Sequence, residues 1–376
     1  MESNLTGNSR TKASRNNHRL YALQGLRAYA AAMVIFVHAI STYDSKVDVI
    51  SGPIGFDGLG AMGLGEMGVK LFFCISGFII FNATKGLVPA PGSVTTFWRR
   101  RIIRVVPIYW LATLVYAVKL ALQGAPPTLA TLGMSLFFVP FTNDIGLMRP
   151  VLGVGWSLNF EMFFYAMFGI SLLLTKQFRA LSLFCALVLL VAFRMGGYLT
   201  QGNGFLLDGL YQLSDYYLFY FLAGLLIGVL REKLAESKTT VSLNFTCALL
   251  GCTGILVLYL GLHHMFVVPP FFREATQAGA CVLCVAISVL EFKPVNHRSD
   301  GLVKRSIGLA GDASYSTYLT HGFAMGPIAR VISYAGLDIG ALFFSLLMIP
   351  VCTCAGILVF RWVERPLMRN LNSRFA

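Results

Sequence analysis

Two ionisable side chains, Arg27 and His38, lie in or beside the first long apolar run of the chain. Eleven helical residues at about 100° each return to nearly the same azimuth, so both side chains face one side of a helix, about 16 Å apart along its axis. Ionisable groups at membrane depth are costly and usually face a polar cavity. Imidazole titrates near neutral pH, so His38 suits proton transfer or transient carriage of an acyl group, and Arg27 suits negative charge. The alternatives are an arginine that anchors at the interface and a buried structural histidine.

A basic segment precedes the third apolar run. Arg101 and Arg104 are three residues apart and share a helical face. Guanidinium groups bind phosphate oxygens in a bidentate geometry, so the pair suits a polyanionic cytosolic donor such as coenzyme A. Binding of anionic lipid headgroups is the alternative.

Polar side chains also interrupt two later apolar runs. Glu161 shares a helical face with Tyr165 at i+4. A carboxylate in lipid is protonated or paired, so we expect Glu161 to orient His38, to pair with an arginine, or to form a structural ion pair between helices. Ser314, Tyr318 and His321 recur at helical spacing as one polar stripe, which either holds helices together or faces a site.

The elements that carry these residues are long apolar runs. The chain has 376 residues, of which 56% are hydrophobic and only 12% are charged, whereas about a quarter of a soluble domain is charged. A surface that faces lipid explains this small fraction of charged residues. A single large core does not explain it, because the surface of a soluble protein still needs polar groups. The sequence therefore predicts an all-α fold, a polytopic transmembrane helix bundle. We predict about ten spans, at residues 20–42, 66–84, 104–123, 155–175, 179–198, 215–231, 242–262, 275–291, 309–332 and 338–361.

Other segments are expected to stay outside these spans. The stretch 128–140 is apolar but short and ends in proline, so we expect it to be re-entrant or interfacial. Residues 1–19 are polar, and we predict a disordered cytoplasmic tail without a cleavable signal peptide, followed by one membrane domain at residues 20–370. At the inner end of the last span, Pro366 is expected to stop the helix, and Glu364 and Arg365 to anchor it.

The distribution of positive charge predicts the topology. With the N-terminus inside, most of the 30 Lys and Arg residues fall in cytoplasmic segments, as the positive-inside rule requires. An even number of spans with both termini cytoplasmic follows. The net charge is +13, but the basic residues that produce it lie between apolar runs. This distribution is typical of cytoplasmic loops and does not indicate nucleic-acid binding. The outer segments hold only Lys46, Arg149, Arg194, Arg273 and Arg330.

The eight cysteines lie inside apolar runs and do not suggest a disulfide framework. Cys281 and Cys284 have a C-x-x-C spacing, which in other settings is redox-active or binds metal. Free cysteine usually behaves as a small buried hydrophobe, and no second pair or histidine cluster accompanies this one. We therefore predict no metal site.

These motifs resemble, in order and position, those of the membrane acyltransferase type 3 family over residues 20 to 370. One particular stretch, Gly155 to Tyr165, is similar to the exopolysaccharide O-acetyltransferases. The matching segments are Arg27 with His38, Arg101 with Arg104, Trp156 to Glu161, Ser314 to His321, and Glu364 to Pro366.

The resemblance implies an O-acyltransferase of the bacterial inner membrane. It implies acetyl-coenzyme A as the donor, entering from the cytoplasm, and a sugar hydroxyl of an exopolysaccharide or its lipid-linked repeat unit as the acceptor. We predict catalytic roles for His38, Arg27 and Glu161, and donor binding by Arg101 and Arg104. We predict acceptor binding by Trp156, Asn159, Tyr165, Ser314, Tyr318 and His321.

Two alternatives remain open. A glycolipid transporter or flippase shares the many spans and intramembrane charges, although the sequence shows no convincing inverted repeat. The other is an acyltransferase that acts on a lipid or a small glycoside. For the O-acetyltransferase, we expect Arg27, His38 and the Arg101/Arg104 pair to converge on one water-lined chamber that opens to the cytosol.

Overall fold

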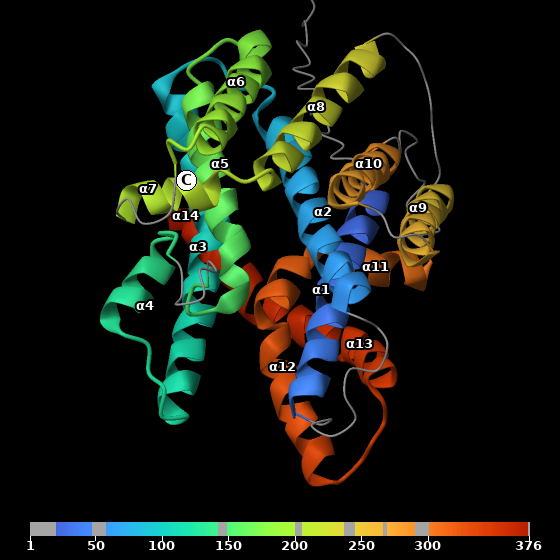
Figure 1. Ribbon diagram of the computed structural model, residues 1–376. Helices are drawn as coiled ribbons and strands as arrows, with labels where there is room; N and C mark the ends of the chain where they lie inside the picture. Colours follow the sequence, from blue (N-terminus) through green and yellow to red (C-terminus); the bar gives the residue numbers. More distant parts are fainter. Residues whose placement is uncertain are drawn as a thin grey trace, which may run out of the picture.

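A computed structural model describes residues 20–46, 58–141, 149–199, 205–236, 245–265, 269–289 and 301–374. Every regular element in these ranges is helical, which confirms the all-α prediction. The predicted tail at residues 1–19 lies outside the described residues. In chain order (Figure 1), the elements are α1 (Tyr21–Lys46), α2 (Gly58–Thr84), α3 (Pro91–Leu122), α4 (Leu129–Leu136), the 3-10 turn η1 (Gly153–Gly155), α5 (Trp156–Ser171), α6 (Lys176–Met195), α7 (Phe205–Leu213), α8 (Tyr217–Glu236), α9 (Phe245–Met265), α10 (Pro270–Val289), α11 (Leu302–Asp312), α12 (Ser314–Tyr334), α13 (Ala341–Val359), the π-helical turn η3 (Phe360–Glu364) and α14 (Arg365–Arg374).

Several helices are long and apolar enough to cross a membrane. Among the described residues six meet this criterion, and a seventh crossing results if α7 and α8, which meet at a bend of 52°, form one span. Each of the ten predicted ranges contains a helix, but ten crossings and the cytoplasmic side of both termini stay predictions. The stretch 128–140 contains α4, whose eight residues are too few to cross.

The outer surface of the bundle is apolar. Helices α3, α6 and α13 expose large hydrophobic side chains that a soluble protein would bury. In lipid such a surface has no cost, and helices satisfy their own backbone groups. The fold is therefore that of a multi-pass membrane protein. Exposed examples are Leu114, Val118, Phe184, Leu189, Phe343 and Leu346.

The helices form two groups that meet along a seam. Helices α3 to α6 lie on one side, and α1, α2 and α9 to α13 lie on the other (Figure 1). Helix α1 is the centre of the second group, because it contacts α2, α9, α10, α11, α12 and α13. Across the seam, α5 contacts α8 and α3 contacts α12. This arrangement leaves the polar faces of α1, α3, α5 and α12 turned toward one another.

Glycines let α2 and α8 pack backbone to backbone. A Cβ atom added at Gly224 would lie 1.8 Å from the carbonyl oxygen of Cys74, and one added at Gly77 would lie 1.9 Å from that of Phe221. Close approach through small residues is the usual way in which membrane helices gain packing energy. The pair therefore forms a rigid frame behind the seam.

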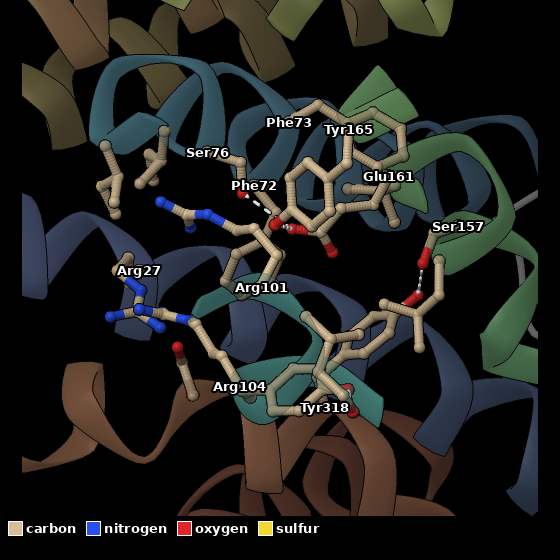
Figure 2. A pocket seen from close by; sticks show the side chains of 17 residues that line it. Arg27, Phe72, Phe73, Ser76, Arg101, Arg104, Ser157, Glu161, Tyr165 and Tyr318 are labelled. Carbon is tan, nitrogen blue, oxygen red and sulfur yellow. Dashed lines mark hydrogen bonds between the residues drawn. The ribbon is translucent and has the colours of Figure 1, made fainter. Parts of the chain in front are cut away.

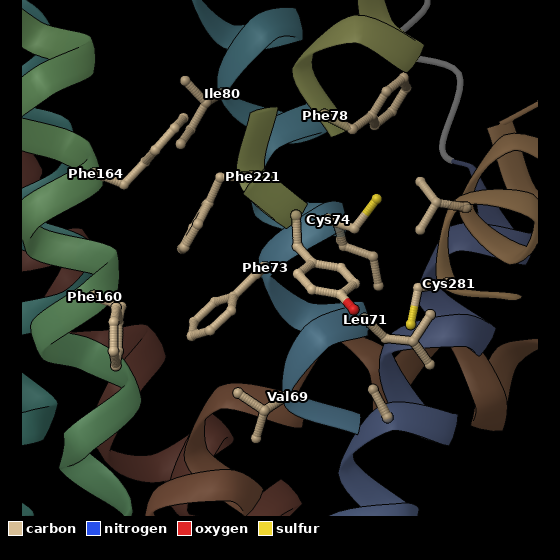
Figure 3. Close-up of a cluster of buried hydrophobic side chains, with 14 of the residues drawn as sticks. Val69, Leu71, Phe73, Cys74, Phe78, Ile80, Phe160, Phe164, Phe221 and Cys281 are labelled. Carbon is tan, nitrogen blue, oxygen red and sulfur yellow. The ribbon is translucent and has the colours of Figure 1, made fainter. Parts of the chain in front are cut away.

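Aromatic rings join this frame to α5. Figure 3 shows Phe221 between Phe73 of α2 and Phe164 of α5, and both ring centroids lie 4.5 Å from that of Phe221. Stacked rings of this kind add about 0.5–1.5 kcal/mol each beyond the burial of their area. The stack fixes where α5, which carries Glu161, stands relative to α2.

A buried lysine joins α2 to α10. Lys70 is fully buried, and its Nζ lies 3.0 Å from Glu66 Oε1 and 2.6 Å from Glu274 Oε2. It also donates to Gln277 Oε1 at 2.5 Å. This cluster was not predicted from the sequence, although an i,i+4 charge pair inside an apolar run was a signal for it.

The cysteines serve as packing groups. Cys281 and Cys284 are buried and unbridged in α10. Cys252 of α9 lies with its Sγ 3.4 Å from the carbonyl oxygen of Cys284. Small polarizable side chains here fill the contact between α9 and α10.

The end of the last span differs from the prediction. The prediction that Pro366 stops the helix is wrong, because α14 runs from Arg365 to Arg374 and Pro366 is its second residue. Proline is accommodated here because the π-helical turn η3 lies directly before it; in a regular α-helix its missing N–H and its ring would disrupt the preceding turn. The π-helical turn before it turns Glu364 inward, where this carboxylate accepts a hydrogen bond from Ser316 Oγ.

Candidate active site

The predicted donor-binding arginines share one cavity. It has a volume of about 70 Å³ and lies on the seam between α1, α2, α3, α5 and α12. Figure 2 shows the guanidinium groups of Arg27, Arg101 and Arg104 together at one side of it. We call it the arginine cavity; it is lined by Arg27, Arg101, Arg104, Glu161, Tyr165, Ser314 and Tyr318, together with apolar side chains of α2.

The positive charge of this cavity is not neutralised by direct ion pairs. Arg27 and Arg101 are only 8% and 6% exposed. None of the ion pairs in the described part of the chain involves either of them or Arg104. Arg101 Nε has no hydrogen-bond partner, and its guanidinium lies 5.6 and 5.5 Å from the ring centroids of Phe97 and Tyr165. Buried charges are normally paired, so this cavity is suited to an anion.

Glu161 is held by hydroxyl groups. It accepts hydrogen bonds from Ser76 Oγ at 3.3 Å and from the hydroxyl of Tyr165, both drawn in Figure 2. The expectation that Glu161 orients His38 is wrong, because His38 bonds to a different residue. The alternative pairing with an arginine is also not formed at ion-pair distance.

His38 instead pairs with His321, which lies 283 residues later in the chain. His38 Nδ1 lies 2.6 Å from His321 Nε2, and the two rings stack with centroids 4.9 Å apart. His321 Nδ1 lies 2.8 Å from the carbonyl oxygen of Tyr318. His321 is 3% exposed, whereas His38 is exposed to an open cavity.

These contacts assign the tautomers. A carbonyl oxygen only accepts, so His321 Nδ1 must carry the proton. In neutral His321 the Nε2 atom is then an acceptor, so His38 Nδ1 must donate to it. The remaining nitrogen, His38 Nε2, keeps a lone pair. This chain of carbonyl, imidazole and imidazole holds His38 as a base, much as a third group orients the base of other catalytic sites.

The histidine pair faces a second, larger cavity. It has a volume of about 830 Å³ and is lined by residues of α1, α3, α5, α7 and α12 and of the segments before α5 and between α7 and α8. We call it the histidine cavity; its residues include His38, His321, Trp156 and Tyr217. The ring centroids of Trp156 and Tyr217 lie 5.4 Å apart, so aromatic faces line one side of it.

A hydrogen-bonded wall separates the two cavities. Tyr318 lines the arginine cavity, and its hydroxyl bonds to Ser157 Oγ at 2.8 Å and to the carbonyl oxygen of Val154 at 3.0 Å. His321, three residues further along α12, lines the other side. The expectation of one chamber that holds Arg27, His38 and both later arginines is therefore wrong. Arg27 and His38 lie about 16 Å apart along α1, as eleven residues require, and each lines its own cavity.

The remaining predicted site residues divide between the two sides. Tyr165, Ser314 and Tyr318 line the arginine cavity, and Trp156 and His321 line the histidine cavity. Asn159 is 2% exposed in α5 and lines neither.

A family model described as an acyltransferase domain matches residues 20–361 of the chain. The chain belongs to the membrane acyltransferase type 3 family. This membership makes it an acyltransferase.

Two characterised relatives agree with this assignment. The chain is 36% identical over 325 residues to the exopolysaccharide production protein ExoZ of Rhizobium meliloti (strain 1021), covering 83% of this chain and 92% of that protein. It is 27% identical over 387 residues to the acyltransferase MdmB of Streptomyces mycarofaciens, covering 95% and 93% of the two chains. No solved structure matches the chain significantly.

Sequence reasoning about this acyltransferase missed the residues that form the wall. Ser157 lies inside a motif but was given no role, and its bond to Tyr318 joins helices that are 161 residues apart. Glu364 was expected to anchor a helix end, yet it is 5% exposed and accepts a hydrogen bond from Ser316 of α12. A helical wheel does not reveal either contact, because it describes only one helix at a time.

Proposed function

We propose that this acyltransferase moves an acetyl group from acetyl-coenzyme A to a sugar hydroxyl of an exopolysaccharide or of its lipid-linked repeat unit. One observation carries the proposal. Two cavities of different chemistry meet at a wall beside an oriented histidine pair, so that a donor and an acceptor can each enter from its own side.

The arginine cavity suits the donor. Within the described residues none of its three guanidinium groups forms an ion pair, and coenzyme A carries several phosphates that such groups bind well. With the N-terminus in the cytoplasm, as the distribution of Lys and Arg predicts, this cavity lies toward the cytosol, where acetyl-coenzyme A is found. The protein then belongs in the inner membrane of a bacterium.

The histidine cavity suits the acceptor. It is much the larger of the two, it is open, and it offers aromatic faces and polar groups beside His38. The name of the 36% identical relative refers to exopolysaccharide production, which supports a saccharide acceptor.

The histidine pair suits the chemical step. His38 Nε2 takes the proton of the acceptor hydroxyl while that oxygen attacks the thioester carbonyl carbon. The hydroxyls of Ser157 and Tyr318 stand at the wall, and either one can donate to a developing oxyanion by turning its proton away from the carbonyl oxygen of Val154. The carbon–sulfur bond then breaks, the ester remains on the sugar, and the thiolate of coenzyme A takes the proton from His38. His321 keeps His38 in the required tautomer throughout.

The test uses purified protein in lipid nanodiscs with radiolabelled acetyl-coenzyme A and an oligosaccharide acceptor. We expect label to move to the oligosaccharide with the wild type, and transfer to fall by about 10²–10⁴-fold with His38→Ala, the usual contribution of a general base. The exposed residue Ser45, two turns later on α1 and outside the lining of the histidine cavity, gives a control, Ser45→Ala, that keeps the wild-type rate. A normally folded His38→Ala variant that transfers at the wild-type rate would refute this mechanism.

The acceptor class is tested separately. Mass spectrometry of the surface polymer from a deletion strain should show loss of acetyl esters. Unchanged polymer, with esters lost from a lipid or a small glycoside instead, would reject the polysaccharide acceptor while leaving the transferase activity in place.

A further inference from the structure

Three of the five basic side chains assigned to outer segments gather in one place. Of the Lys and Arg residues assigned to outer segments, Lys46, Arg149 and Arg330 line the histidine cavity. Lys119, inside α3, lines it as well. We call these four residues the outer basic cluster. A cation in an outer segment or inside a span goes against the usual distribution of charge, and four of them at one cavity therefore need a common explanation.

This cluster forms no ion pair with a carboxylate within the described residues. Asp215 also lines the cavity, but its carboxylate is paired with Arg194 at 3.4 Å. A partly enclosed cavity with one sign of charge concentrates ligands of the opposite sign.

Three members of the cluster are close enough to act together. The positive charges of Lys46 and Arg330 both act on Lys119. In the described residues the ammonium group of Lys119 contacts the rings of Tyr116 and Phe323, whose centroids lie 5.0 and 6.0 Å from its Nζ. Mutual repulsion without a counter-charge is unfavourable, so an anion that bound here would relieve it.

Two members of the cluster lie away from the reacting centre along their helices. Lys46 follows His38 by eight residues on α1, and Arg330 follows His321 by nine residues on α12. These separations correspond to about 12 and 14 Å along the helix axes, which exceeds the width of a single sugar ring. A group bound by the cluster therefore belongs to a different part of the acceptor from the hydroxyl at His38.

We propose that the acceptor is an anionic glycan, and that the outer basic cluster binds its carboxylate or phosphate group while the hydroxyl of another sugar lies at His38. This rests on the proposed function, since it takes the histidine cavity as the acceptor site. The anion has two sources: an acidic sugar of the repeat unit itself, or the pyrophosphate that links a repeat unit to a lipid carrier. In both cases the cluster determines which acceptor binds and which of its hydroxyl groups lies at His38.

The test compares three acceptors with the wild type and a Lys119→Gln/Arg330→Gln variant in nanodiscs. The acceptors are a neutral oligosaccharide, the same oligosaccharide with one hexuronate, and the neutral oligosaccharide on a polyprenyl pyrophosphate. We expect kcat/KM of the wild type to be about tenfold higher or more for at least one anionic acceptor, a factor typical of one charged contact. The acceptor that shows the gain identifies the source of the anion.

In the variant this gain should be lost, while kcat/KM for the neutral acceptor and KM for acetyl-coenzyme A stay unchanged. Two controls isolate the effect. Arg273→Gln removes an outer cation that does not line the cavity, and Lys119→Arg/Arg330→Lys keeps the charge; both should retain the preference. Added salt should weaken the wild-type preference, because ions screen charges that face water.

An equal preference of wild type and variant would overturn the proposal, as would an equal loss with all three acceptors. Equilibrium binding of the acidic and neutral oligosaccharides, without acetyl-coenzyme A, separates this proposal from the proposed function. If no acceptor is acetylated but the variant binds the acidic oligosaccharide about tenfold more weakly than the wild type, the transferase proposal fails and the anion site stands. If binding is the same in both proteins, the anion site is rejected whatever the activity.

Discussion

Replacement of Arg101 by lysine gives the sharpest test of the donor site. The guanidinium of Arg101 is 6% exposed, lies over the rings of Phe97 and Tyr165, and has an Nε without a partner in the arginine cavity. Lysine keeps the charge but presents it at a single point, so it loses the planar fork that fits two phosphate oxygens at once. The change therefore isolates geometry from charge.

The expected magnitude follows from the contacts that are lost. One hydrogen bond to a charged group contributes about 1.5–3 kcal/mol. Since about 1.4 kcal/mol corresponds to a factor of ten, the apparent KM for acetyl-coenzyme A should rise by about 10- to 150-fold in Arg101→Lys. The contact is made before the chemical step as well as during it, so kcat should change much less than KM.

The assay is steady-state transfer from labelled acetyl-coenzyme A at saturating acceptor, in nanodiscs. Arg100→Lys is the matched control, because Arg100 is the preceding residue of α3 and is exposed; its KM should stay at the wild-type value. An unchanged KM in Arg101→Lys, or an equal rise in both variants, would refute the assignment of Arg101 to donor binding.

Three further predictions concern positioning and stability. His321→Ala should lower kcat by about tenfold to a hundredfold, less than the full contribution of a general base, without a change in KM for acetyl-coenzyme A; a KM effect of the same size would instead point to general damage. Gly224→Ala should lower the unfolding free energy by about 1–3 kcal/mol or more, because its methyl group would overlap the backbone of α2. Gly254→Ala, with nothing within 4 Å of the added atom, should be neutral, and equal melting temperatures would contradict the close contact. Lys70→Met should cost about 3–5 kcal/mol by leaving two carboxylates unpaired, whereas Lys176→Met, which removes a side chain that is 47% exposed, should cost less than about 1 kcal/mol. Comparable thermal shifts would show that the buried ion pairs of Lys70 are not structurally important.

The sequence by itself determined the class of protein and the identity of its helices. Apolar runs long enough to span a bilayer predicted helices at ten places, and each of these places holds one. The spacing of Arg101 and Arg104 correctly placed both side chains on one face toward the same cavity. These inferences depend only on the 3.6-residue period and on the cost of charge in lipid, which are properties of a single segment.

The motifs also identified the family, which the match over residues 20–361 confirms. They did not show which of the motifs contact one another in the folded protein. Local rules also failed at Pro366, where a π-helical turn lets the chain continue as α14. The effect of proline on a regular α-helix was interpreted correctly, but whether the helix ends at Pro366 depends on the π-helical turn before it.

Only the tertiary structure decided that the site has two cavities and that His38 belongs with His321. That bond joins α1 to α12, and the helical period says nothing about such a contact, because it fixes where a side chain points around its own axis and not which helix lies opposite. Glycine contacts between α2 and α8 and the ring stack onto α5 set those distances. The outer basic cluster has the same origin: its members look like isolated exceptions along the sequence, and they become a site only when α1, α3 and α12 bring them to one cavity.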